Sequence, residues 1–119
     1  MKEKRWAAEV DIMRNHFPDF RLFRTEEGLI GFDGALRGRT GAIYTVRIAI
    51  RESSYPYRVP QAFISPKVGP YIEPDGALSL ICPWQPDKSA FALVTLCAMQ
   101  YLWTYDGAND FTSTKGEMP

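Results

Sequence analysis

The chain has 119 residues, which fits one domain and leaves little room for a second. Hydrophobic residues make up 45% of it and charged residues 24%, the balance of a globular domain large enough to fold without disulfides or metals. The 14 basic residues offset the 14 acidic ones, and the formal net charge of +0 excludes a bulk field that would draw the chain onto nucleic acid or a membrane.

The first predicted element is a helix over about residues 3–16. Its apolar residues recur at helical spacing and form one stripe: Trp6, Val10, Met13 and Phe17. Pro18 ends this helix. Strands are then expected over residues 20–24, 29–36, 43–51 and 61–64, with turn residues between the first three. The third strand is the clearest, because tyrosine, valine and isoleucine alternate there with polar or small residues.

Proline dominates the region that follows. Seven prolines fall between residues 55 and 86, and only residues 61–64 read there as a strand. Because proline fixes φ and cannot donate to a sheet, this region is expected to be a stiff, irregular loop, and loops of this length tend to carry function. Ser89 then caps a helix that runs to about Tyr105. Its apolar face is predicted to hold Ala90, Leu93, Val94, Cys97, Tyr101 and Tyr105.

Targeting signals, metals and cofactors are not indicated. The charged N-terminus has no apolar run behind it, and no stretch approaches the roughly 20 apolar residues that cross a bilayer. Two cysteines, Cys82 and Cys97, without an export signal suggest the reducing cytoplasm. The single histidine, His16, argues against a histidine-based zinc site, so no metal or cofactor is predicted.

Four short segments, taken in order, resemble the ubiquitin-conjugating enzymes. Residues 55–60, Tyr-Pro-Tyr-Arg-Val-Pro, resemble the family's Tyr-Pro-x-x-x-Pro segment. Residues 69–71, Gly-Pro-Tyr, stand where the family usually has His-Pro-Asn. Residues 75–80, Asp-Gly-Ala-Leu-Ser-Leu, are similar to the active-site run Gly-x-Ile-Cys-Leu and put Ser79 in the cysteine position. Residues 84–86, Trp-Gln-Pro, resemble the Trp-x-Pro that precedes the next long helix.

The resemblance implies a fold and a domain plan. It implies an α+β domain with an N-terminal helix, a four-stranded antiparallel meander, a long proline-rich active-site loop and a C-terminal helix. The conjugating-enzyme-like domain would span residues 1–106, followed by a polar, flexible tail over residues 107–119. Many eukaryotic members have two more helices. This shorter chain is similar to minimal bacterial proteins of ubiquitin-like operons, including those of antiviral defence.

The resemblance also implies an activity, and Ser79 decides whether the chain has it. The family carries the C-terminus of a ubiquitin-like modifier as a thioester and passes it to an amine. A serine hydroxyl is a poor nucleophile without an adjacent base, and the sequence offers none near Ser79. Three interpretations stay open: an engineered replacement of cysteine, a natural non-catalytic variant, or Cys82 as the nucleophile. The structural alternative for Cys82 is a small buried residue, which is what free cysteines most often are, and Cys97 is expected in the core.

Helper residues are implied in the same way, each with a structural alternative. Tyr71 stands in place of the asparagine that supports the oxyanion, and either donates a hydrogen bond there or packs on the loop. Gly76 belongs to the frame around Ser79. Asp106 and Asp110 fall where the family orients the incoming amine, or they belong to a solvated helix end.

Partners follow from the resemblance as well. The first helix is basic through Lys2, Lys4, Arg5 and Arg14. In the family this helix meets the activating enzyme, although a basic helix face is commonly only solvated. The other implied partners are a ubiquitin-like modifier and a protein target, while nucleic acid and membrane are not expected. The rival class is a non-catalytic interaction module of the same fold.

Overall fold

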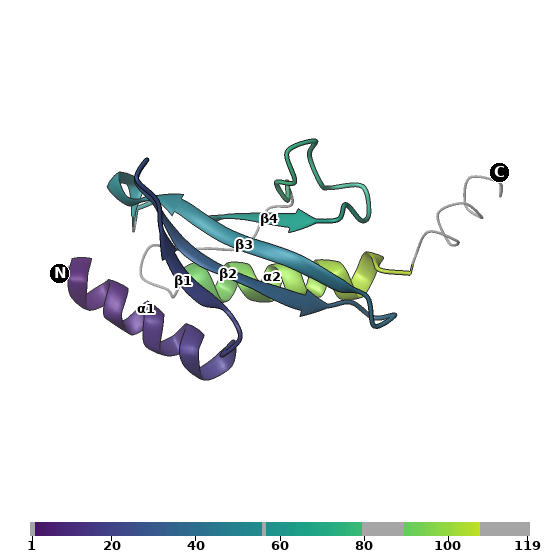
Figure 1. Cartoon of the computed structure of the whole chain (residues 1–119), viewed down its shortest axis with the longest axis horizontal. Coiled ribbons are helices and arrows are strands. Elements are labelled where there is room, and N and C mark those ends of the chain that lie inside the picture. Colours follow the sequence, from purple (N-terminus) through teal and green to yellow (C-terminus); the bar gives the residue numbers. More distant parts are fainter. Residues whose placement is uncertain (1, 56, 80–89, 108–119) are drawn as a thin grey trace.

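A computed structural model describes residues 2–55, 57–79 and 90–107 (Figure 1). Its elements in chain order are α1 (Lys2–His16), β1 (Arg21–Arg24), β2 (Leu29–Arg37), β3 (Ile43–Arg51), the 3-10 helix η1 (Glu52–Ser54), β4 (Gln61–Ser65) and α2 (Ala90–Tyr105). The expected α+β architecture is confirmed, and the predicted helices and strands agree with these bounds to within one residue at each end. Of the tail predicted over residues 107–119, residues 108–119 lie outside the described residues.

The four strands form one antiparallel meander in the order β1-β2-β3-β4. The longest pairing joins β2 to β3, from Leu29 opposite Arg51 to Arg37 opposite Ile43. The alternation predicted for β3 is confirmed, because four side chains of one face are buried: Tyr44, Val46, Ile48 and Ile50. Strand alternation therefore gives the sheet one apolar face and one face that carries arginine and aspartate.

Both helices cover the apolar face. In Figure 1, α2 runs behind the strands, and it contacts β2, β3, β4 and α1. Trp6 of α1 stacks on Phe32 of β2 at a centroid distance of 5.8 Å and meets Phe91 of α2 edge-on at 5.5 Å. This aromatic contact joins two helices and the sheet in a single core.

The face that α2 buries differs from the predicted one. Ala90, Val94 and Tyr101 are buried as expected, but Leu93, Cys97 and Tyr105 are only half-buried. The residues that complete the buried face are Phe91, Ala92, Thr95, Ala98 and Leu102. The reason is that α2 has no charged residue, so its sequence carries little polarity difference between its faces, and packing against the sheet sets the rotation.

A buried carboxylate ties the two helices together. Glu9 of α1 is 1% exposed and accepts hydrogen bonds from the Phe91 backbone amide and the Tyr55 hydroxyl, each at 3.0 Å. Phe91 lies in the first turn of α2, where backbone amides have no partner within the helix and an anion is favoured. Burial and the neighbouring Glu9 raise the pKa of Tyr55. Tyr55, the first residue of the Tyr-Pro segment, is therefore a structural anchor.

No helix in the parts of the chain that the structure describes is long and apolar enough to cross a membrane.

Candidate functional site

A narrow hairpin carries the candidate site, where the sequence predicted only irregular loop. The backbone amide of Gly76 donates to the Glu73 carbonyl, and the amide of Glu73 donates to the Ala77 carbonyl, both at 2.8 Å. Gly76 has a φ of +92°, a conformation that favours glycine. Pro74 and Asp75 fill the two central turn positions, which are preferred sites for these residue types. Gly76 thus shapes the backbone of the site.

The second arm of the hairpin is fastened to β4. The backbone amide of Ile64 donates to the Gly76 carbonyl, and that of Leu78 donates to the Ala62 carbonyl, both at 2.8 Å. Leu78 is 5% exposed and belongs to the core. Position 79 therefore comes directly after a residue that is fixed by both its backbone and its side chain.

Ser79 is exposed, and both of its polar hydrogens point to the same acceptor. Its backbone amide and its hydroxyl donate to the Tyr71 carbonyl oxygen, at 2.8 Å and 3.1 Å. Within the described residues, no hydrogen bond joins Ser79 to a carboxylate, an imidazole or an amine. His16 is the last residue of α1 and makes no hydrogen bond to Ser79. The geometry thus holds the serine in place, and no group among the described residues activates its oxygen.

Gln61 supports the backbone immediately before Ser79. Its side-chain amide donates to the Leu78 carbonyl at 2.7 Å and to the Ala62 carbonyl at 2.9 Å. Sequence reasoning missed this role, because a glutamine at the exposed start of a strand carries no signal of a long-range partner. The contact bridges β4 and the hairpin, and so fixes where position 79 lies.

Tyr101 of α2 forms hydrogen bonds with the segment that leads into the hairpin. Its hydroxyl donates to the Val68 carbonyl at 2.7 Å and accepts from the Tyr71 backbone amide at 3.0 Å. Burial raises the pKa of Tyr101. A Cβ on Gly69, where φ is +72°, would lie 2.5 Å from the Tyr101 hydroxyl oxygen. Glycine at the first position of the Gly-Pro-Tyr segment therefore permits the close approach of the loop to α2.

The Tyr71 side chain packs against α2. Its ring meets the rings of Tyr101 and Tyr105 edge-on, at centroid distances of 6.4 Å and 6.2 Å, and remains partly exposed. No hydrogen bond joins its hydroxyl to any described residue. Of the two interpretations of Tyr71, this arrangement favours loop packing, while its carbonyl oxygen is the group that meets Ser79.

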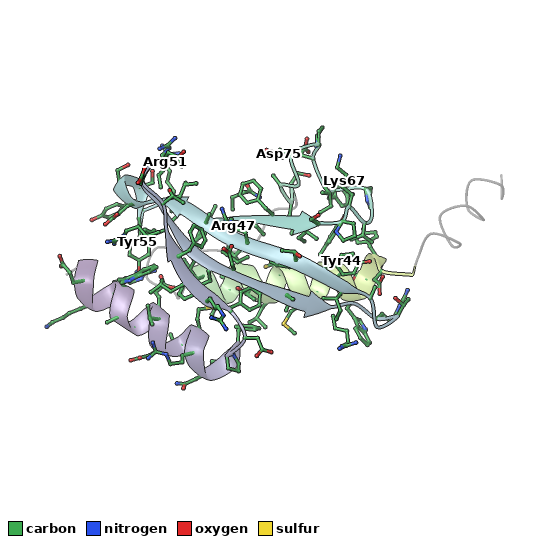
Figure 2. All side chains as sticks on the ribbon, viewed as in Figure 1. Tyr44, Arg47, Arg51, Tyr55, Lys67 and Asp75 are labelled. Carbon is green, nitrogen blue, oxygen red and sulfur yellow. The ribbon has the colours of Figure 1, made fainter. Side chains whose placement is uncertain are left out.

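Asp106 fastens the end of α2 to the turn between β2 and β3. Its carboxylate accepts from the Thr40 amide and hydroxyl, both at 2.7 Å, and from the Tyr44 hydroxyl at 2.6 Å. The Thr40 and Tyr44 hydrogen bonds lower the pKa of Asp106, while burial and Asp106 raise that of Tyr44 to about 12. Figure 2 shows Tyr44 beside the end of α2. The carboxylate is an anchor here, and its role toward an amine stays a prediction.

The structure describes some of the remaining residues that were predicted to have a role and leaves others out. Cys97 is disulfide-bonded, which corrects the expectation of a reduced core thiol. Arg5 of the basic α1 pairs with buried Glu9 at 3.5 Å. No group of three histidine, cysteine, aspartate or glutamate side chains able to hold a metal occurs in the described part of the chain. Cys82, Asp110 and the Trp-Gln-Pro segment lie outside the described residues.

No protein-family model, no curated protein and no solved structure matches the chain. The resemblance to the ubiquitin-conjugating enzymes therefore stays a prediction from the short segments and their order.

Proposed function

We propose that this chain is a ubiquitin-conjugating-enzyme-like domain that binds proteins of a ubiquitin-like pathway and forms no covalent intermediate of its own. The observation that carries the proposal is the state of Ser79. Its hydroxyl donates to a backbone carbonyl oxygen, and no base among the described residues is placed to take its proton. A binding domain retains the architecture and the exposed loop of such an enzyme without needing a reactive oxygen.

The arrangement of the chain supports the likeness to conjugating enzymes. A helix, a four-stranded antiparallel meander, a loop with an exposed residue at the candidate position, and a second helix follow in the expected order. Residues from three of the four segments that suggested the likeness have defined places in this arrangement. Tyr55 is held by Glu9, Gly69 lies against Tyr101, and Gly76 turns the hairpin that ends at Ser79.

The chemistry of acyl transfer supports the absence of a covalent step. A carrier must first attack an activated modifier and then leave easily when an amine attacks. A thiolate does both, because part of a cysteine population is ionised at neutral pH. A serine hydroxyl needs a general base for the attack, and an oxyester is a poorer donor to an amine. Ser79 with a carbonyl as its hydrogen-bond partner meets neither requirement.

Titration of the ¹⁵N-labelled chain with purified ubiquitin and other ubiquitin-like modifiers tests the proposal. We expect backbone amide signals to shift progressively with at least one modifier, while the intact mass of the chain stays unchanged. The Ser79→Ala variant should give the same shifts, because binding does not use the hydroxyl. The absence of shifts with every modifier at concentrations up to about 1 mM would contradict a binding role, because a complex with a free energy of binding of about −4 kcal/mol would be half-formed there.

A thioester carrier is the second candidate, and the frame around position 79 favours it. The hairpin presents an exposed side chain directly after the fixed residue Leu78, which is where a carrier cysteine would need to lie. If the frame is intact, Ser79→Cys should form an adduct in the presence of an activating enzyme, ATP and modifier, and a thiol should release it. No adduct with the cysteine variant, or an adduct on Ser79 that survives thiol, excludes this candidate.

A further inference from the structure

A groove lies on the face of the sheet that the helices leave uncovered. It has a volume of about 430 Å³ and crosses from β2 over β3 to β4 and the segment before β4. Three arginines lie along it, namely Arg47 and Arg51 of β3 and Arg58 after η1, and we call it the arginine groove. Figure 2 shows Arg51 at one end of β3 and Arg47 farther along the same strand.

The floor of the groove includes Ala49, whose side chain is small. Gly31 of β2 pairs with Ala49 of β3 on this face, and Ala49 is only 4% exposed although it lies on the uncovered side. Leu29 and Phe63 flank this floor, and Val59, which is 45% exposed, adds an apolar wall. The floor and walls therefore offer apolar surface to a side chain that enters.

The charges along the groove are all positive, since no aspartate or glutamate is among the described residues that line it. Arg47 is neutralised by Asp33, which it meets through two hydrogen bonds of 2.7 Å and 2.9 Å. Arg51 donates only to the Glu27 carbonyl at 3.2 Å, and Arg58 forms no side-chain hydrogen bond or ion pair with a described residue. Two guanidinium groups thus face an apolar groove with no described carboxylate to neutralise them.

We propose that the arginine groove docks an acidic–apolar peptide segment of a partner protein, with an apolar side chain on the floor and carboxylates on Arg51 and Arg58. The proposal rests on the proposed binding function and names the surface and the chemistry of its partner. Guanidinium groups bind carboxylates through paired hydrogen bonds, and opposite charge supplies both attraction and selectivity. The chain as a whole has a net charge of +0, so this attraction is local to the groove.

A peptide suits the groove better than a small molecule because the groove is an open surface feature. Small-molecule sites enclose most of their ligand, whereas an extended peptide binds along a surface and inserts only some side chains. Acidic side chains on either side of one apolar residue match the arginines along the apolar floor. The partner is thus expected to present that pattern in an extended or disordered segment.

Panning of a random seven-residue phage library on the immobilised chain tests the proposal. We expect the enriched peptides to share an apolar residue flanked by aspartate or glutamate. A synthetic peptide of that consensus should lose roughly tenfold or more in affinity toward Arg51→Gln/Arg58→Gln, measured by fluorescence anisotropy. Binding should also weaken as salt is raised, because the contact is electrostatic.

A matched control removes the same charge elsewhere on the sheet. Arg21→Gln/Arg37→Gln changes two exposed arginines that do not line the groove, and it should bind the peptide as the unchanged chain does. Amide shift mapping on the unchanged chain gives a second readout that needs no variant. The peptide should shift the amides of Ala49, Arg51 and Gln61.

Three results would overturn the proposal. One is enrichment of peptides without acidic residues, or no enrichment at all. Another is equal affinity for the groove variant and the control variant. The third is a set of shifted amides on the exposed apolar stripe of α2, around Leu96, Met99 and Trp103, instead of the groove. Modifier binding with no selected acidic peptide would leave the proposed function standing and refute only the arginine groove.

Discussion

Replacing Glu9 by alanine should destabilise the chain strongly, because its buried carboxylate holds three elements together. The change removes the acceptor for the Phe91 amide and the Tyr55 hydroxyl, and leaves both donors buried without it. A hydrogen bond to a charged group contributes about 1.5–3 kcal/mol, and breaking a buried pair costs about 3–5 kcal/mol. We therefore expect a loss of about 4 kcal/mol in the free energy of unfolding.

That loss translates into a large shift of the melting temperature. At about 2.1 cal/mol/K per residue, unfolding 119 residues changes the entropy by about 0.25 kcal/mol/K. A loss of about 4 kcal/mol then lowers the Tm by about 16 °C, which circular dichroism at pH 7 measures directly. Asp11→Ala is the matched control, since Asp11 is an exposed carboxylate on the same helix, and it should move the Tm by no more than about 2 °C.

A double-mutant cycle isolates the contact itself. Tyr55→Phe should cost about 1–2 kcal/mol in the unchanged chain and much less when Glu9 is already alanine, giving a coupling of about 1 kcal/mol or more. If Glu9→Ala melts within about 2 °C of the unchanged chain, or if the two changes simply add, the carboxylate does not hold Tyr55 and α2 as described.

Three further predictions concern the sheet, the end of α2 and Cys97. A Cβ on Gly31 would overlap the Ile48 carbonyl oxygen, so Gly31→Ala should fail to give a cooperative melt. Gly28→Ala has open space around its Cβ but must adopt a φ of +93°, so it should still melt cooperatively, with a loss of about 1–2 kcal/mol. The lowered pKa of Asp106 means that its charge stabilises the fold above about pH 4, the pKa of an unfolded aspartate, and that this contribution is lost as the pH falls through the folded pKa. Urea unfolding from about pH 6 to about pH 2 should therefore show a steeper acid decline for the unchanged chain than for Asp106→Asn, and parallel curves would contradict the anchor. The disulfide of Cys97 predicts that the unreduced, denatured chain titrates fewer than two thiols with a disulfide reagent and two after reduction; two thiols before reduction would refute it.

The parts of the fold that are local in sequence could be predicted. The alternation in β3 is a strong period signal, and the apolar residues of α1 together with Pro18 after it predict that helix and its end. The buried face of α2 could not be predicted, because an uncharged helix shows little difference in polarity between its faces. Packing against the sheet determines that Phe91 and Leu102 are buried. The hairpin before Ser79 could not be predicted, because Pro74 indicates irregular structure. Its strand-like pairing depends on β4 rather than on its own residues.

The prediction of a site at Ser79 came from the motif order, whereas the contacts that hold Ser79 in place could not be predicted. The motif order alone pointed to Ser79, and the structure places it exposed at the end of a fixed hairpin. Gln61 and Tyr101 could not be found, because each acts through hydrogen bonds to backbone carbonyls distant in sequence. The sequence gives no sign that Glu9 and Asp106 are buried acceptors, because only tertiary packing brings their hydrogen-bond donors to them.

The central claim is that the Ser79 hydroxyl is not an activated nucleophile. Incubation of the chain with a fluorophosphonate, which labels activated serines, followed by intact-mass measurement tests it most directly. We expect no added mass on the chain under conditions that fully label a serine hydrolase, and no difference between the chain and its Ser79→Ala variant. An adduct mapped to Ser79 and absent from the alanine variant would show an activated oxygen and contradict the account.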